Sequence, residues 1–450
     1  MRRVRRTVAA LSTAVLSAVA AVLLQASAAS ADLIGHGGPV RGIAVSADGR
    51  LALTASFDYS AILWDLDRQT VIRRLQGHDA AVNTVAFVPG GRLAITGSDD
   101  RTVAIWELAG GRLLHRLTGH EGKVTSVAVS PNGRLAASAG WDRTVRLWHL
   151  DTDGAPGAVL RHDANVNGVA FLPDGSGLLS GDHDGDLTLW RLPDGGAAGL
   201  LGDHDFGVSA LALAGSAPVA VTASADETVV LWDLDVREEL STLRGHEGPV
   251  FAVAIADDGR LVASGGADGR VRLWRREADG GVSRTDIDHQ GPVWALAFTP
   301  GGDRLVSAGI DDVARIWEVA TGRASRGGST AVRPPETIVT ADPALARGAE
   351  LFRTCQACHT LDPDGGNRAG PTLHGLIGRP AGSVPGYAYS PALADSDIVW
   401  TEATIGRLFA EGPHVYTPGS KMPLQRIPDA SDRAELVRFL AGVAGRHDSR

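Results

Sequence analysis

Three residue types are scarce in this chain of 450 residues, which has two cysteines, two methionines and two lysines. The cysteines, Cys355 and Cys358, cannot supply the four thiolates of an all-cysteine zinc site, and they are not adjacent in sequence. Met1 stands at the N-terminus, so Met422 is the other methionine. These shortages restrict the side chains that could carry metal or redox chemistry.

The chain also lacks an excess of positive charge. Its formal net charge is -9, with 43 Lys and Arg against 52 Asp and Glu. Residues 1–31 contain four arginines and no acidic residue, so their removal changes the net charge from -9 to -13. Nucleic-acid binding, which depends on basic groups that neutralise phosphates, is therefore not expected.

Residues 1–31 have the features of a secretory signal peptide. Four arginines precede an apolar run from Val8 to Leu24, and the small residues Ala29–Ala31 follow. The run is shorter than the ~20 residues of a membrane span, so no stable membrane insertion is expected, with an uncleaved anchor as the alternative. We expect export of an unfolded chain, cleavage near Ala31 and a periplasmic location.

A histidine, an aspartate and a tryptophan recur seven times with a step of 42 residues, and of 43 at the end. Each aspartate lies 22 residues after its histidine and six before its tryptophan. Alternating apolar runs and turn sequences in each unit predict four short antiparallel strands. The residues are His36, His78, His120, His162, His204, His246 and His289; Asp58, Asp100, Asp142, Asp184, Asp226, Asp268 and Asp311; and Trp64, Trp106, Trp148, Trp190, Trp232, Trp274 and Trp317.

The repeat resembles the WD40 family. Gly-His openings such as Gly77-His78 and Trp-Asp closings such as Trp64-Asp65 carry the resemblance, which covers residues 32–321. It implies an all-β, seven-bladed propeller, because stacked units bury sheet faces that one unit cannot bury alone. It also implies that the repeated histidines, aspartates and tryptophans form hydrogen bonds within each blade, rather than a metal or catalytic site.

Six fourth strands lie between repeats, but no apolar alternation follows Trp317. We therefore predict that Asp32–Ile34 supplies the seventh and closes the ring. The WD40 family often has serine or threonine two residues before the blade aspartate. At this position three blades have serine and four do not. We expect these four to be tied less tightly; the replacements are Gly140, Asp182, Gly266 and Gly309.

One end of the propeller is predicted to hold a docking surface. In WD40 proteins the residues before the blade aspartates and after the strand-opening valines tend to face one end of the ring. Phe57, Phe251, Trp294 and Ile310 occupy such positions on consecutive blades. They would form an apolar patch for a protein ligand or for the chain's own C-terminal domain, and scattered surface aromatics are the alternative.

A second domain is predicted after a linker over residues 322–342, which is rich in Gly, Ser, Thr, Arg and Pro. A helix expected from Pro343 runs into Cys355-Gln356-Ala357-Cys358-His359. This is the pattern for covalent haem attachment, in which two thiols add to the haem vinyl groups and the histidine binds the iron. A redox-active or zinc-binding CxxC is the alternative, although zinc would need two further ligands.

Met422 is predicted to be the second iron ligand. Its sequence, residues 418–423, reads as an exposed Gly/Ser/Lys/Pro loop and not as a core segment. His374 and His414 are the substitutes. Histidine and methionine on the iron would leave no position for a substrate.

Residues 343–445 resemble class I cytochromes c of the mitochondrial and c2 type, with residues 446–450 as a tail. The matching residues are Cys355, Cys358 and His359, Gly370–Leu376, Gly378-Arg379, Tyr389-Ser390, Trp400 and Tyr416–Met422. The resemblance implies a small all-α domain with one haem c and iron.

Particular roles follow from the same resemblance. The Pro371 carbonyl should accept a hydrogen bond from the His359 ring and orient it. Arg379, Tyr389 and Trp400 should surround the haem propionates. The terminal helices should cross through Gly348, Phe352, Leu436 and Phe439.

The charge of the C-terminal part departs from that family, which often has a ring of lysines around the haem edge. Residues 343–450 hold one lysine, ten arginines and eleven acidic residues, so strong electrostatic steering by this part is not expected. The remaining charge of -13 falls on residues 32–342 and would attract a basic partner.

The sequence therefore predicts a periplasmic electron carrier that exchanges electrons with redox partner proteins, rather than an enzyme, with the propeller as docking scaffold. Two alternatives remain: a redox enzyme with a second cofactor in the propeller, and an interaction scaffold in which the haem senses redox state.

Overall fold

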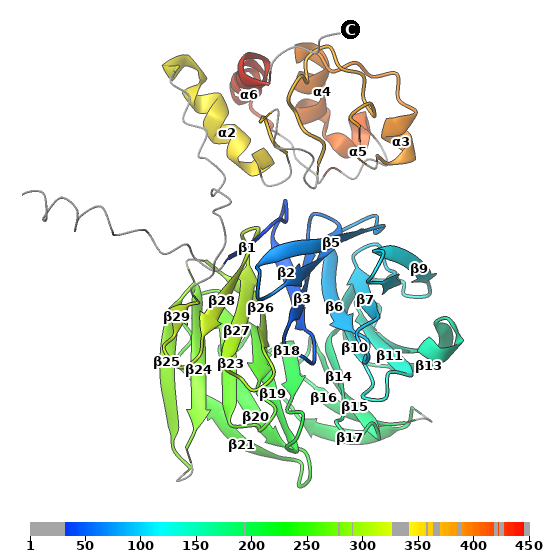
Figure 1. Cartoon of the computed structure of the whole chain (residues 1–450), viewed down its shortest axis with the longest axis vertical. Coiled ribbons are helices and arrows are strands. Elements are labelled where there is room, and N and C mark those ends of the chain that lie inside the picture. Colours follow the sequence, from blue (N-terminus) through cyan, green and yellow to red (C-terminus); the bar gives the residue numbers. More distant parts are fainter. Residues whose placement is uncertain are drawn as a thin grey trace, which may run out of the picture.

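The computed structural model describes residues 32–192, 195–277, 280–289, 291–325, 342–356, 359–362, 370–385, 387, 389–417, 422 and 427–444. The predicted signal peptide, Cys358 and the predicted tail lie outside the described residues. A ring of antiparallel sheets is followed by a small group of helices (Figure 1). The fold is therefore the predicted one, an all-β propeller and then a small all-α domain.

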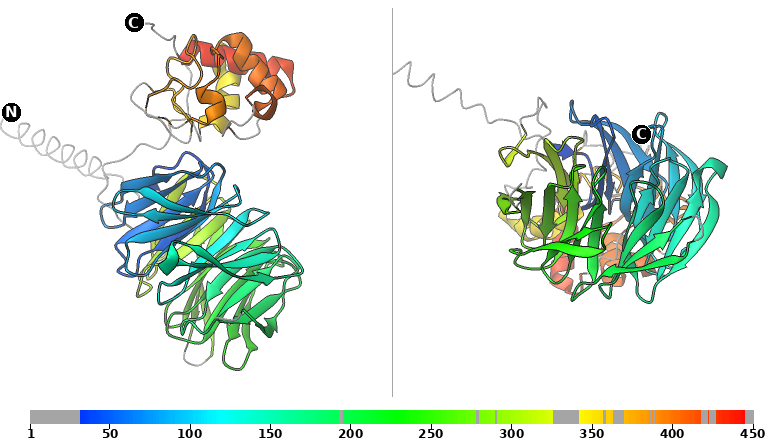
Figure 2. Two further views of the ribbon diagram at one scale, coloured as in Figure 1. Left: turned by 90° about the vertical axis from the view of Figure 1, so that its right-hand side faces the viewer. Right: turned by 90° about the horizontal axis from the view of Figure 1, so that it is seen from below.

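The seven sheets are arranged radially, as the view from below shows (right panel of Figure 2). From the inner to the outer strand, blades one to four contain β2 (Val40–Val45), β3 (Leu51–Ser56), β4 (Ser60–Asp65) and β5 (Thr70–Gln76); β6 (Val82–Phe87), β7 (Leu93–Ser98), β8 (Val103–Glu107) and β9 (Arg112–Leu117); β10 (Val124–Val129), β11 (Leu135–Gly140), β12 (Thr144–His149) and β13 (Ala155–Arg161); β14 (Val166–Phe171), β15 (Gly177–Asp182), β16 (Leu187–Arg191) and β17 (Ala197–Gly202). Blades five to seven contain β18 (Val208–Leu213), β19 (Val219–Ser224), β20 (Val229–Asp233) and β21 (Glu238–Leu243); β22 (Val250–Ile255), β23 (Leu261–Gly266), β24 (Arg270–Arg276) and β25 (Val282–Asp288); β26 (Val293–Phe298), β27 (Arg304–Gly309) and β28 (Val313–Glu318).

The ring closes as predicted. Strand β1 (Asp32–Ile34) pairs antiparallel with β28 and places Asp32 opposite Arg315, and the Leu33 side chain is fully buried. The sequence analysis missed β29 (Arg323–Ala324), which pairs with the far end of β28. The outer edge of blade seven is thus built from two separate pieces of chain.

The propeller core lies between successive blades. One apolar cluster joins Leu33, Val306 and Ile316 of blade seven to Ile62 and Trp64 of blade one. The other blade pairs repeat this arrangement, so each sheet buries both faces against its neighbours. This packing explains why the ring needs every blade.

Every inner strand has a register shift directly after its opening valine, as between Val40 and Gly42 in blade one. A shift of this kind leaves one residue unpaired and turns its side chain away from the ladder. We call these seven residues the bulge ring. They are Arg41, Asn83, Thr125, Asn167, Ser209, Phe251 and Trp294.

The expected hydrogen-bond network is present in blades one, two, three and five. In blade one, His36 Nδ1 lies 2.8 Å from Asp58 Oδ2, while His36 Nε2 and Trp64 Nε1 lie 2.6 and 2.7 Å from Thr54 Oγ1. Blade three keeps its pair, His120 and Asp142, although it lacks the serine. Among the described residues, however, it has no counterpart to the two bonds of Ser56 in blade one, which donates to the Gly38 carbonyl and accepts from the Asp58 N–H. Blade three is therefore tied less tightly, as predicted, although its His-Asp pair is kept.

Blade four corrects one assignment, because His162 pairs with Asp182 at 3.0 Å and not with Asp184. In the regular blades a hydroxyl two residues after the aspartate donates to it, as Ser60 does to Asp58. The corresponding residue after Asp184 is Asp186, whose carboxylate cannot donate. Asp182 takes the place of the aspartate and accepts from the backbone N–H groups of residues 184 and 186.

Arginines alter the last two blades. In blade six, Arg272 donates to Asp268 at 2.6 Å and lies 2.7 Å from His246 Nδ1. In blade seven the predicted contact between His289 and Asp311 is absent, since Asp311 pairs with Arg315 at 2.5 Å. His289 Nδ1 instead lies 3.3 Å from the Gly291 carbonyl.

The C-terminal part contains η2 (Pro343–Leu345), α2 (Ala346–Gln356), α3 (Pro391–Ala394), α4 (Glu402–Glu411), α5 (Pro413–Tyr416) and α6 (Ala430–Val443). Helices α2 and α6 cross where predicted, with the Phe352 and Phe439 rings 5.4 Å apart. A Cβ on Gly348 would lie 2.3 Å from the Glu435 carbonyl oxygen, so this close crossing requires glycine. Across the described part of the chain, no helix is long and apolar enough to span a membrane.

Candidate functional site

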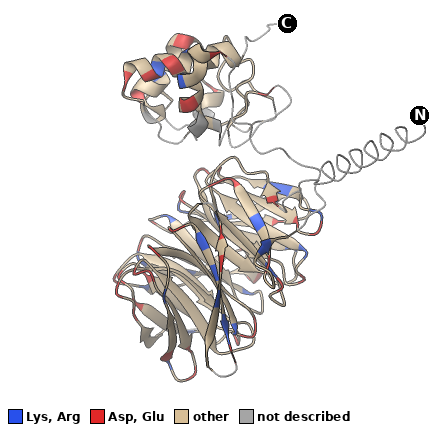
Figure 3. Cartoon of the chain, turned by 90° about the vertical axis from the view of Figure 1, so that its left-hand side faces the viewer, with Lys and Arg blue, Asp and Glu red and all other residues tan. Residues whose placement is uncertain are grey.

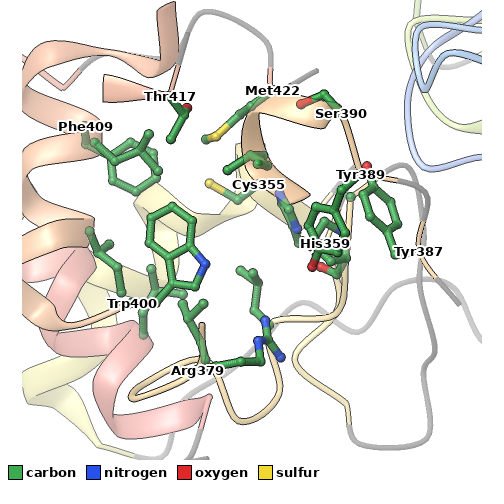
Figure 4. A pocket seen from close by; sticks show the side chains of 18 of the residues that line it. Cys355, His359, Arg379, Tyr387, Tyr389, Ser390, Trp400, Phe409, Thr417 and Met422 are labelled. Carbon is green, nitrogen blue, oxygen red and sulfur yellow. Dashed lines mark hydrogen bonds between the residues drawn. The ribbon is translucent and has the colours of Figure 1, made fainter. Parts of the chain in front are cut away.

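A pocket in the helical part brings together predicted site residues from distant segments (Figure 4). Cys355 comes from the end of α2, His359 follows it, and Met422 comes from the segment between α5 and α6. The walls are mainly apolar side chains from α2, α4, α6 and the loop before α3. They include Phe352, Leu376, Ile405, Leu408, Phe409 and Leu440.

The position of His359 is fixed from two sides. Its backbone N–H donates to the Cys355 carbonyl at 2.9 Å, which continues the turn of α2. Its ring Nδ1 lies 2.8 Å from the Pro371 carbonyl oxygen, which leaves Nε2 as the nitrogen available for a metal. A Cβ on Gly370 would lie 2.2 Å from the ring, so glycine is needed beside it.

Arg379, Tyr389 and Trp400 line the same pocket. The buried Arg379 guanidinium donates to the carbonyls of Thr372 and His374, both at 2.7 Å. Burial lowers the pKa of Arg379, and the neighbouring Tyr389 offsets part of this change. Burial raises the pKa of Tyr389, which keeps its hydroxyl protonated. The arrangement provides a cation and a hydroxyl donor at one wall.

One of the two substitute iron ligands, His374, does not share this position. His374 is exposed and is not among the described residues that line the pocket. The side chain of His414 lies outside the described residues. Met422 packs against the helical core and lines the pocket, so it remains the predicted ligand opposite His359.

The sequence analysis assigned no role at the site to several lining residues. Tyr387 packs edge-on against Tyr389 with ring centres 4.8 Å apart. Its position two residues before Tyr389 was the sequence feature that could have indicated its place in the pocket. Ser390 and Thr417 also line the pocket, as do Phe57–Tyr59 of propeller blade one. For Phe57 this agrees with the predicted apolar patch, one of whose two expected occupants was the chain's own C-terminal domain, whereas Asp58 and Tyr59 were not expected here.

The pocket fits a large planar cofactor. Its lining combines mainly apolar side chains with a few polar ones, including His359, Arg379 and Tyr389, which is the composition usual for cofactor sites. The buried Ser390 hydroxyl has no hydrogen-bond partner among the described residues, so a polar group of a cofactor could satisfy it. A thiol, an imidazole and a thioether face this space, which is the donor set of a covalently bound haem.

Comparison with known proteins agrees with both parts. The family model described as WD domain, G-beta repeat matches residues 29–65, 69–107, 111–149, 154–191, 198–233, 237–275 and 281–318, and the cytochrome c model matches residues 345–444. This chain is a WD40-repeat protein with a cytochrome c domain. The helical domain therefore carries covalently attached haem c with its iron, and its activity is electron transfer.

The cytochrome c domain is similar to proteins of known name. It is 44% identical over 97 residues to a cytochrome c of Gibberella zeae, a match that covers 21% of this chain and 91% of that protein. A cytochrome c2 of Rhodomicrobium vannielii is 35% identical over 100 residues, covering 22% of this chain and 79% of the relative. These similarities concern the C-terminal fifth of the WD40 protein.

Proposed function

We propose that this WD40–cytochrome c protein is a periplasmic one-electron carrier with His359 and Met422 as the iron ligands. The observation that carries the proposal is the convergence of His359, Met422 and Cys355 on one apolar pocket. Haem c supplies an iron that alternates between Fe(III) and Fe(II), and methionine ligation favours the reduced form. Cys355 and Cys358 hold the macrocycle covalently.

The surrounding residues position and insulate this group. The Pro371 carbonyl fixes the His359 ring through the 2.8 Å contact to Nδ1. Arg379, Tyr389 and Trp400 receive the propionates, and the apolar walls exclude water. With His359 and Met422 as ligands the iron would have no position for a substrate, and the group would supply one-electron transfer.

The propeller serves as the docking scaffold for redox partners. Residues 32–342 carry a net charge of -13, whereas residues 343–450 are neutral. In Figure 3 the helices carry both acidic (red) and basic (blue) residues. Attraction to a basic partner thus resides in the propeller, and salt should weaken it.

The ligand assignment is tested on the exported, haem-loaded chain. We expect one haem per chain, and a sulfur-to-iron absorption band in the oxidised protein that disappears in Met422→Ala. The matched variant His374→Ala should retain the band, because that histidine is exposed. A band that survives in Met422→Ala contradicts the assignment.

The location is tested separately by fractionating cells that produce the full chain or a chain without residues 1–31. Haem attachment and periplasmic recovery should require residues 1–31. Equal haem content in both chains would contradict export.

A further inference from the structure

A cavity of about 510 Å³ lies at the end of the propeller channel where the inner strands begin. All seven members of the bulge ring line it. Its size falls in the range of small-ligand sites, about 300–1,000 Å³. It shares no lining residue with the pocket of the helical domain, so this cavity is separate from the electron-transfer site.

Three neutral members of the ring, Asn83, Thr125 and Asn167, tie neighbouring blades together. Asn83 Nδ2 donates to the Val124 carbonyl at 2.9 Å. Thr125 Oγ1 donates to the Val166 carbonyl at 2.7 Å, and the Asn167 amide repeats the contact one blade further on, at 2.8 Å. In blades two to four the ring position therefore has a structural role, because its side chain donates a hydrogen bond to the next blade.

Arg41 occupies the same position in blade one but makes no such bond. Among the described residues, its guanidinium has no hydrogen bond and no ion pair, and it lies 5.5 Å from the centre of the Trp294 ring. Lys123 shares the cavity wall, with its ammonium 3.4 Å from the centre of the Trp141 ring and, within the same described set, no ion pair. Two cations thus line one cavity with their donors uncommitted.

The local charge is not balanced. Burial lowers the pKa of both Arg41 and Lys123, and the Asp99 carboxylate offsets this in part. Asp99 also accepts a hydrogen bond from Asn83 at 2.7 Å. Two cations against one carboxylate leave a positive surplus in a propeller that is strongly acidic overall. Partly buried charge without a counter-ion is costly, so an anion would stabilise this region.

We propose that the cavity binds a carboxylate held by Arg41 and Lys123, with the apolar body of the ligand against Trp294 and Phe251. A guanidinium binds a carboxylate through two parallel hydrogen bonds, and an ammonium adds a third. The aromatic residues of the ring provide the apolar side of the site. The carboxylate comes either from a small organic acid or from an acidic segment of a partner protein.

The experiment uses the haem-loaded full chain and calorimetric titration. The probes are 3-phenylpropionate, its uncharged amide, and the capped peptide acetyl-Leu-Glu-Phe-amide. We expect the carboxylate to bind and the amide not to bind. Tighter binding of the peptide identifies a partner segment as the source, whereas tighter binding of 3-phenylpropionate identifies a small acid.

Variants make the test specific. Arg41→Gln and Lys123→Gln should each weaken carboxylate binding by about tenfold or more, as expected for a charged hydrogen bond. Arg275→Gln, an exposed strand position with no ion pair among the described residues, should leave binding unchanged. Within the described part of the chain neither cation has a hydrogen bond or an ion pair, and each only contacts a tryptophan ring, so the variants should keep the parent's fold. Absence of binding of either carboxylate to the parent, or equal binding in Arg41→Gln, overturns the proposal.

Discussion

Asp58 and Asp311 occupy equivalent positions in blades one and seven but have different surroundings. The Asp58 carboxylate is fully buried and contacts His36 at 2.8 Å and Arg74 at 3.0 Å. Asp311 is partly exposed, contacts Arg315 and has no histidine partner within the described residues. The same residue type in the same register therefore contributes differently to stability.

Asp58→Asn should lower the free energy of unfolding of the propeller by about 2–3 kcal/mol, because it leaves Arg74 and His36 without their buried counter-charge. The matched change Asp311→Asn should cost less than about 1 kcal/mol, since its ion pair is partly exposed. Urea unfolding followed by tryptophan fluorescence measures both. Equal losses in the two variants would show that the buried network of blade one contributes no more to stability than the partly exposed ion pair of blade seven.

Acid should destabilise the propeller through the same carboxylates. Burial alone would raise the pKa of Asp58. His36 and Arg74 lower it by a larger amount, so the pKa lies below its ordinary value. A lowered pKa in the folded state means that the stabilisation is present above the unfolded value of about 4 and is lost as the pH falls below it. Unfolding free energy should therefore decline below about pH 4, and less steeply in Asp58→Asn. Parallel curves for the parent and the variant would contradict this.

At the scale of elements, regular repetition made the blades predictable. Each unit has the same strand period, and the closing strand β1 follows from the missing fourth strand after Trp317. The exceptions depend on contacts that spacing does not encode. Asp182 replaces Asp184 because Asp186 cannot donate a hydrogen bond, and β29 forms on an edge that β1 leaves uncovered.

The site shows the same division. Cys355, His359, Pro371 and Met422 were predicted from a motif and from family resemblance, and the structure gathers them at one pocket. The contribution of Phe57–Tyr59 was predicted only in part, because Phe57 alone was assigned to a patch that could dock the C-terminal domain. It depends on how two separately encoded domains meet, which no local pattern specifies.

The crossing of α2 and α6 yields a paired prediction. Gly348→Ala should destabilise the helical domain by about 2 kcal/mol, because the new methyl group meets the Glu435 carbonyl and the Phe439 side chain. Gly406→Ala in α4 meets no atom within 4 Å and should stabilise by up to about 1 kcal/mol through helix propensity. Thermal unfolding followed by haem absorbance distinguishes them. Shifts of the same sign would refute the crossing argument.

At the scale of the whole molecule, the described apolar clusters of the propeller and the helical domain are separate. The cluster of the helical domain includes Phe352, Leu376, Ile405, Phe409 and Leu440, and the same five line the pocket. The cofactor therefore completes the core of one domain and is no part of the other domain's core.

A chain made without haem attachment should keep a folded propeller and lose the helical domain, because its core residues would face an empty pocket. Limited proteolysis should leave a resistant fragment that ends near Ser325, while haem-loaded protein should resist cleavage in α2 and α6. Equal protection of these helices without haem would contradict the prediction. The strand signal in circular dichroism serves as the control for the propeller.

The pairing of β1 with β28 has a consequence for the order of synthesis and folding. Asp32 and Arg315, which face each other in the register, are 283 positions apart, and closing a loop of that length costs about 5 kcal/mol of chain entropy. The first strand emerges early and must wait for the last blade, with its edge exposed to other chains. Ring formation is therefore a late, high-contact-order event. A chain that stops before Val313 lacks the strand with which Asp32–Ile34 pairs, so the edge of its first strand stays exposed.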